Sequence, residues 1–162
     1  MSADNTSLLR DAALAGSVAS LASTAALAAQ GRRETGRASA PINAISHWVH
    51  GPAAYAANEP DARHTGLGLV IHHASALLWG LVYVALLRRA AASQPRLDTP
   101  WKAAAVTTLV AAVTDFKLVP PRLTPGFEHH LSRGSGTVTY LAFGVGLALS
   151  GLWLEARRRR KA

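Results

Sequence analysis

The chain has 162 residues, 49% of them hydrophobic, and a formal net charge of +8 at neutral pH. It contains no cysteine, which excludes disulfides and thiolate chemistry. Charged residues crowd between apolar runs instead of forming polar helix faces, a pattern typical of a membrane protein and not of a water-soluble bundle. We therefore expect one all-α membrane domain over residues 1–162, an integral four-helix bundle with two short outer interfacial helices.

The positive charge does not indicate a nucleic-acid partner. Five basic residues form a run that directly follows an apolar segment: Arg157, Arg158, Arg159, Arg160 and Lys161. Such a run is typical of an anchor at the anionic inner leaflet of a membrane. The expected partners are the lipid bilayer and, within it, other membrane proteins or a second copy of the chain.

The first expected span covers about residues 11–30 and is only weakly apolar. Small residues recur along it at a spacing that lets another helix approach closely: Ala12, Gly16, Ser20 and Ser23. A cleavable signal peptide is the alternative, because residues 26–28 resemble a processing site. Acidic residues, however, offset the single Arg10 in the region that a signal peptide keeps positive, so we favour a retained helix.

A short helix is expected at about residues 41–50, because Pro41 can start a helix and Gly51 with Pro52 must end one. About ten residues are too few to cross a bilayer. Its polar side chains share one stripe: Asn43, Ser46, His47 and His50. The pattern predicts an amphipathic helix that lies at the interface or re-enters between the spans. His47 and His50 can face one metal ion, or both can satisfy loop carbonyls.

The second expected span, about residues 66–87, is the most apolar and stops at two arginines. His72 and His73 are adjacent near its start and point about 100° apart, so they are not expected to serve one site. His72 is the better candidate, because its helix face continues through small, polar and aromatic residues. Ionisable groups inside a span usually face the bundle interior and have a partner there.

The third expected span, about residues 100–119, opens with Thr99 as a cap before Pro100 and closes at two prolines. Asp115 lies near its outer end. If His72 and Asp115 meet, the pair can orient a metal-bound imidazole, relay a proton or form a structural hydrogen bond.

A second short outer helix is expected at about residues 125–133, started by Thr124 with Pro125 and stopped by Gly134. It would carry Glu128, His129 and His130. The alternative is a charged loop packed over the mouth of the bundle. The fourth expected span then covers about residues 137–154 and has a second face of small residues.

The distribution of basic residues predicts the orientation. With both termini cytoplasmic, the inner side holds ten Lys and Arg residues and the outer side seven. We expect a multi-pass protein of a bacterial inner (plasma) membrane. Because alternate connections of a serial bundle share a side, the histidines would then gather at the outer face.

Three segments, residues 43–48, 71–76 and 118–128, are similar to stretches in small bacterial inner-membrane proteins that carry no assigned function. The resemblance covers about residues 41–132 and implies a four-helix membrane fold without implying an activity. Membrane desaturases and hydroxylases also gather histidines at one membrane face, but their boxes have the forms HxxxH and HxxHH. This chain has neither.

The sequence leaves several functions open. The first is a structural, interaction or accessory protein with a His, Asp and Glu cluster at the outer face. The alternative is a metal-dependent membrane enzyme or metal carrier, and a proton or solute path is a third reading. A divalent metal is the cofactor that these residues suit, whereas haem b would need a second histidine on a facing helix. The candidate metal ligands are His47, His50, His72, Asp115, Glu128 and His129.

Overall fold

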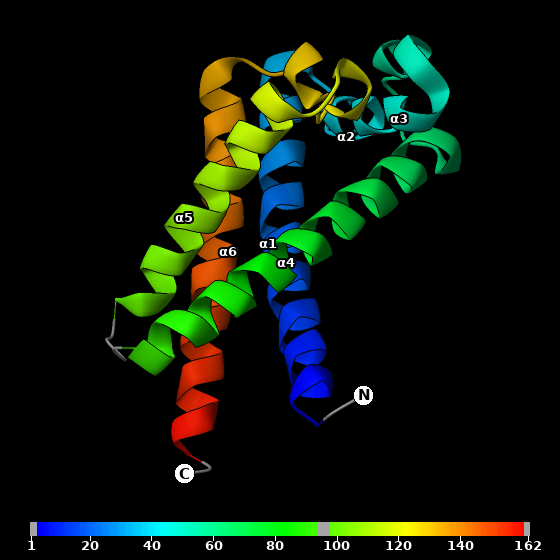
Figure 1. The fold of residues 1–162 in the computed structure, drawn as a ribbon. Coiled ribbons are helices and arrows are strands. Elements are labelled where there is room, and N and C mark those ends of the chain that lie inside the picture. The colour runs from blue at the N-terminus through cyan, green and yellow to red at the C-terminus, as the bar shows by residue number, and fades with distance from the viewer. Residues whose placement is uncertain (1–2, 94–97, 161–162) are drawn as a thin grey trace.

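The computed structural model describes residues 3–93 and 98–160, and these ranges contain helices and no strand. Four helices form its body: α1 (Ala3–Thr35), α4 (Leu67–Ser93), α5 (Thr99–Val113) and α6 (Arg133–Arg159) (Figure 1). Shorter elements connect them: α2 (Ala40–Ile45), α3 (His47–His50), η1 (Gly51–Ala56), η2 (Ala62–Gly66), η3 (Thr114–Leu118), η4 (Pro121–Leu123) and η5 (Phe127–His129).

Three helical segments in the described ranges are long and apolar enough to cross a membrane: Asn5–Thr35, Ala62–Ser93 and Arg133–Arg159. The third span expected from the sequence differs. Helix α5 has 15 residues, which corresponds to about 22 Å, whereas the hydrocarbon core of a bilayer is about 30 Å thick. Regular α-helix stops at Val113 because a π-helical turn, η3, follows and Val119 then becomes extended.

Small residues let α1 touch the backbones of both α4 and α6. A Cβ atom at Gly80 of α4 would lie 2.6 Å from the carbonyl oxygen of Ala12 and 2.7 Å from the nitrogen of Gly16. On the other side, a Cβ at Gly146 of α6 would lie 2.7 Å from the Cα of Ala19. The predicted small-residue face of α1 is therefore a two-sided packing surface, where close contact maximises dispersion attraction.

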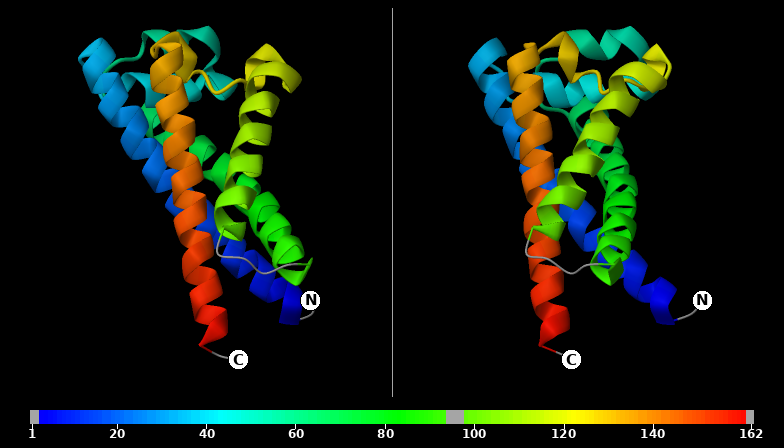
Figure 2. Two further views of the ribbon diagram at one scale, coloured as in Figure 1. Left: turned by 90° about the vertical axis from the view of Figure 1, so that its left-hand side faces the viewer. Right: turned by 60° about the vertical axis from the view of Figure 1, so that its left-hand side comes forward.

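Buried charges join the same three helices at the opposite end from the short elements. The carboxylate of Asp11 on α1 accepts hydrogen bonds from Arg88 of α4 at 2.9 Å and from Arg158 of α6 at 3.1 Å. The Asp11 side chain is only 6% exposed. The first residues described in α1 and the last in α6 lie at this end (Figure 2).

Residues 36–61 and 119–132, which we call the cap, lie across the other end of the long helices (Figures 1 and 2). The short helix expected at 125–133 is absent from the cap. Gly126 has a φ of 86° and interrupts the chain there, and only the 3-10 turn η5 forms. Gly134 does not stop a helix either. It lies in the first turn of α6, which begins earlier than expected because the hydroxyl of Ser132 accepts a hydrogen bond from the Ser135 nitrogen.

The short helix expected at 41–50 is present as two pieces, α2 and α3, which meet at Ser46. Gly51 ends α3 with a φ of 66°. The apolar side of α2 does not lie free at an interface. Ile42 and Ile45 are buried in a cluster with Leu27, Phe127 and Leu131. The amphipathic pattern left either lipid or the spans as the neighbour of this side, and in the structure the side packs against protein.

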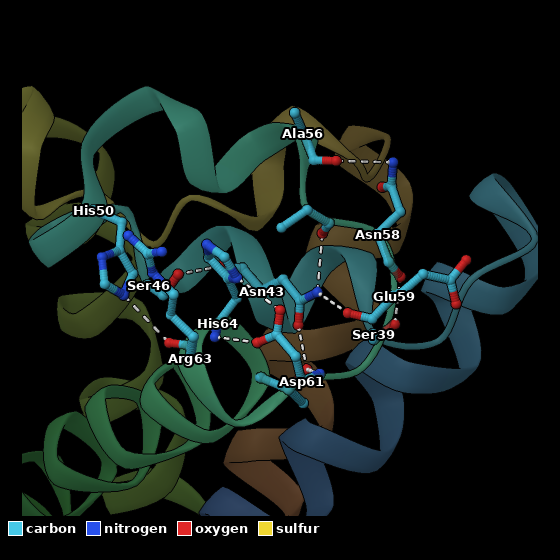
Figure 3. A network of polar contacts seen from close by, with 12 residues as sticks. Ser39, Asn43, Ser46, His50, Ala56, Asn58, Glu59, Asp61, Arg63 and His64 are labelled. Carbon is cyan, nitrogen blue, oxygen red and sulfur yellow. Dashed lines mark hydrogen bonds and ion pairs between the residues drawn. The ribbon is translucent and has the colours of Figure 1, made fainter.

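The polar side of α2 holds the following loop. Asn43 is fully buried, and its amide nitrogen donates to the carbonyl oxygens of Ala57 at 2.9 Å and Glu59 at 2.8 Å (Figure 3). Its amide oxygen accepts a hydrogen bond from the hydroxyl of Thr65 at 2.6 Å. One side chain thus satisfies three groups of a segment that has little regular structure of its own, which explains why a buried asparagine is tolerated here.

Candidate functional site

A cavity of about 190 Å³ lies beneath the cap, and every long helix contributes to its wall. Its lining is mainly apolar, with a few polar side chains. Helix α4 and the α5–η3 segment form two sides, α1 and α6 contribute the remaining helical wall, and α2, α3 and the loop before η5 close it. The lining residues used below are Ser23, Trp48, His72, Leu78, Trp79, Ala111, Asp115, Leu123, Phe127, Tyr140 and Phe143.

The cavity is not fully enclosed, and residues of α4 and of the α5–η3 segment line it on two sides. These two helices lie close together at their connected ends and diverge toward the cap (Figure 1). Two lining residues are themselves exposed: Leu78 on α4 by 60% and Leu123 in the cap by 39%. An opening bordered by leucines gives an apolar molecule a route into the cavity from the side of the bundle.

His72 forms the first polar group of the wall. Its Nε2 atom lies 2.8 Å from the hydroxyl oxygen of Ser23 on α1. The single proton of that hydroxyl is directed to the carbonyl oxygen of Ala19, also at 2.8 Å. In the tautomer that carries its proton on Nε2, the His72 ring donates to the Ser23 hydroxyl, and its Nδ1 atom is then a hydrogen-bond acceptor.

Asp115 forms the second polar group, in the π-helical turn that ends α5. The hydroxyl of Tyr140 on α6 donates to its Oδ2 atom at 2.6 Å. The Tyr140 ring in turn contacts Phe116 and Phe127, with ring centroids 5.9 and 6.2 Å apart. The carboxylate of Asp115 thus lies beside aromatic rings. It is the only acidic side chain among the residues that line the cavity.

Most of the histidines lie in the cap or next to it. The ring of Tyr55 lies between two of them, stacked on His129 at 3.9 Å between centroids and tilted against His47 at 5.2 Å. The Nδ1 atom of His47 lies 2.9 Å from the carbonyl oxygen of Ala44. These contacts pack η1, α3 and η5 against one another.

Glu128 and His130 flank this aromatic stack. The Oε2 atom of Glu128 and the Nε2 atom of His130 are buried, and neither has a hydrogen-bond partner in the part of the chain that the structure describes. Burial raises the pKa of the Tyr55 hydroxyl, and the negative charge of Glu128 raises it further. Burial also lowers the pKa of His130. Burial at this part of the cap therefore disfavours the charged forms of both side chains.

The six candidate ligands are divided among three places. His72 and Asp115 line the cavity but each bonds to a different partner. His47, Glu128 and His129 lie around Tyr55. His50 instead reaches the carbonyl oxygen of Arg63 at 3.3 Å and contacts the ring of His64. Across residues 3–93 and 98–160, no group of three or more His, Asp or Glu side chains is arranged to hold a metal ion.

The sequence placed Trp79 on the face of His72, but the other aromatic residues of the site were missed. Tyr55 and Tyr140 were not singled out, although a tyrosine buried in an apolar segment usually needs a partner for its hydroxyl. Trp48 likewise lines the cavity while its indole nitrogen donates to the carbonyl oxygen of Thr124. Scanning apolar runs for such polar-tipped aromatics is the signal that would have found them.

Comparison with known proteins adds no relative: no family model, curated protein or solved structure matches this chain.

Proposed function

We propose that this chain is a multi-pass accessory protein of a bacterial inner membrane that binds an apolar molecule in the cavity beneath its cap. In this proposal both termini are cytoplasmic and α5 with η3 completes a four-helix bundle. Support comes from the three long apolar helices and from the basic run that follows the last of them. The cap then lies at the outer face, together with the histidines.

The single observation that carries the proposal is the apolar cavity with two polar groups in its wall. An apolar cavity of about 150 Å³ in another protein holds one benzene molecule. A volume of about 190 Å³ accordingly accommodates one substituted ring or the end of a longer chain. His72 and Asp115 supply acceptors that orient the polar end of the guest, as the few polar groups of ligand pockets generally do.

Filling the cavity tests this function. Ala111 of α5 is buried and lines the cavity, so Ala111→Leu places three further carbon atoms into the space. Ala105→Leu, on the exposed side of the same helix, is the matched control. Binding of tert-butylbenzene to purified protein in detergent is measured by ligand-observed NMR.

We expect wild type and Ala105→Leu to bind the probe and Ala111→Leu to lose at least about tenfold in affinity, or about 1.4 kcal/mol. Equal binding by all three proteins would show that the cavity is not the site.

The metal-dependent alternative remains a second candidate with weaker support. It requires His47, His50 and His72 to share an ion, whereas the structure gives each a different neighbour. Elemental analysis of protein purified without a histidine tag tests it. A stoichiometric metal that disappears in His72→Gln would favour this alternative over the accessory function.

A further inference from the structure

Asp115 is a carboxylate in an apolar wall, and no ion pair within residues 3–93 and 98–160 includes it. Its hydrogen bond comes from the neutral hydroxyl of Tyr140. The ion pairs found in the described ranges join other acidic residues: Asp11, Glu59, Asp61 and Asp98. Removing a carboxylate from water costs free energy that a neutral donor only partly restores. A cation bound in the cavity would offset the remaining cost of burying the Asp115 carboxylate.

The charged residues near Asp115 also favour a cation in the cavity. Glu128, whose buried Oε2 atom lacks a hydrogen bond, acts on Asp115 as a second negative charge. The nearest basic residues along the chain are directed elsewhere. Lys117 is exposed and two positions away on the same turn, and the Arg122 Nε atom donates to the Trp48 carbonyl oxygen. Neither basic residue lines the cavity.

Aromatic rings make up much of the remaining wall. Five of them line the cavity: Trp48, Trp79, Phe127, Tyr140 and Phe143. The faces of such rings attract cations, and the attraction strengthens where water is excluded. Rings also exclude a bare metal ion, which requires several oxygen or nitrogen ligands at once. A carboxylate among aromatic rings instead suits a cation whose charge is covered by carbon.

We propose that the guest of this cavity is an organic ammonium ion, held by Asp115 and by the aromatic wall, with its apolar body extending between α4 and α5. The inference depends on the proposed function, because it specifies the class of ligand that the cavity binds. The ammonium head occupies the polar end of the cavity, and Leu78 and Leu123 border the path of the apolar body.

Two probes of the same shape separate charge from apolar fit. Phenyltrimethylammonium and tert-butylbenzene differ only in the replacement of a quaternary carbon by a charged nitrogen. Both are titrated into wild-type protein in a non-ionic detergent at about pH 8. We expect wild type to bind the ammonium at least about tenfold more tightly than its carbon analogue, as for a desolvated cation beside a carboxylate and aromatic rings.

Asp115→Asn keeps the shape of the side chain and removes its charge. We expect this variant to bind the two probes within about threefold of each other, with affinity for tert-butylbenzene unchanged. Glu59→Gln, at an exposed carboxylate paired with Arg37 in the cap, is the control and keeps the wild-type preference. Tyr140→Phe is the second variant, used if Asp115→Asn does not fold. It frees the carboxylate from its competing donor, and we expect the ammonium to bind at least as tightly as to wild type.

The outcomes distinguish this inference from the proposed function. If wild type binds tert-butylbenzene as tightly as the ammonium, the cavity still binds apolar molecules but the ammonium inference is wrong. A preference that survives in Asp115→Asn, or a loss of ammonium binding in Tyr140→Phe, also overturns the inference. If neither probe binds, both the inference and the proposed function fail.

Discussion

Three consecutive residues of α4, Leu78 to Gly80, have two different surroundings. One of them contacts the backbone of α1, and the other two line the cavity. Gly80 has no side chain, so α1 approaches until their backbones touch. Leu78 and Trp79, by contrast, line the cavity on the side of α5. Side-chain size thus differs between the two sides: glycine lets one interface close, while the neighbouring large side chains line a volume that a guest can occupy.

Gly80→Ala disrupts the close contact between α1 and α4, and we expect it to have the largest effect on stability. The new methyl group meets backbone atoms of Ala12 and Gly16, which cannot rotate away, so α1 and α4 must separate. We expect a loss of about 2–3 kcal/mol in the free energy of unfolding, measured by denaturant titration in detergent micelles.

Gly66→Ala is the matched control. No atom lies within 4 Å of the position of its new Cβ, and its φ is not positive. Replacing this glycine is expected to be neutral or to stabilise by up to about 1 kcal/mol, because alanine is the better helix former. Equal losses in the two variants would show that the contact of α1 with α4 is not the cause.

Asp11→Asn tests whether the charge of Asp11 stabilises the contact of α1 with α4 and α6 at the end opposite the cap. The substitution weakens the hydrogen bonds from Arg88 and Arg158 and leaves two guanidinium groups beside a neutral amide. We expect a loss of about 2 kcal/mol, since these are charge-assisted bonds to a buried acceptor. In the exposed pair of Arg37 with Glu59, Glu59→Gln is expected to change stability little. A similar small effect at Asp11 would contradict the inferred role.

Asn43→Ala loosens the cap that closes the cavity. It removes the two donors to Ala57 and Glu59 and the acceptor for Thr65. We expect a loss of about 1–2 kcal/mol and faster proteolysis within residues 57–61, because the carbonyls of this loop lose buried partners. The exposed Asn58, whose side-chain amide donates to the carbonyl oxygen of Ala56, provides the control Asn58→Ala. Protection of the loop in Asn43→Ala equal to that in the control would overturn this prediction.

The helices were predictable from the sequence wherever local chemistry decides. Pro41 begins α2, Gly51 ends α3, and apolar runs mark the three long segments. Local signals failed where two of them compete. Thr124 with Pro125 is typical of a helix start, yet the left-handed backbone at Gly126 prevails because the chain must turn beneath the cap. The π-helical end of α5 has no comparable signature in sequence.

The site was predictable in part. The sequence singled out His72 and Asp115 as polar residues of the bundle interior, and both line the cavity. Their actual partners, Ser23 and Tyr140, lie 49 and 25 positions away in the chain. Such pairings depend on how the helices cross, which periodicity alone does not determine. His47 and His50 were candidate ligands with bonding to loop carbonyls as the alternative, and each lies by a carbonyl oxygen. The contacts of His47 and His129 with Tyr55 depend on loop paths that the sequence does not specify.

The smallest expected effect concerns pH and the cap. Burial holds the pKa of His130 below its ordinary value of about 6.5 in the folded chain, so the unfolded chain takes up the proton first as the pH falls. The contribution of His130 to stability is therefore intact above the ordinary pKa and decreases between that value and the lowered one. His130→Gln removes this term, and we expect its free energy of unfolding to fall less than that of wild type between about pH 7 and pH 5, by under about 1 kcal/mol. If the free energy of unfolding changed equally with pH in the two proteins, burial of His130 in the cap would not be what lowers its pKa and the prediction would be wrong.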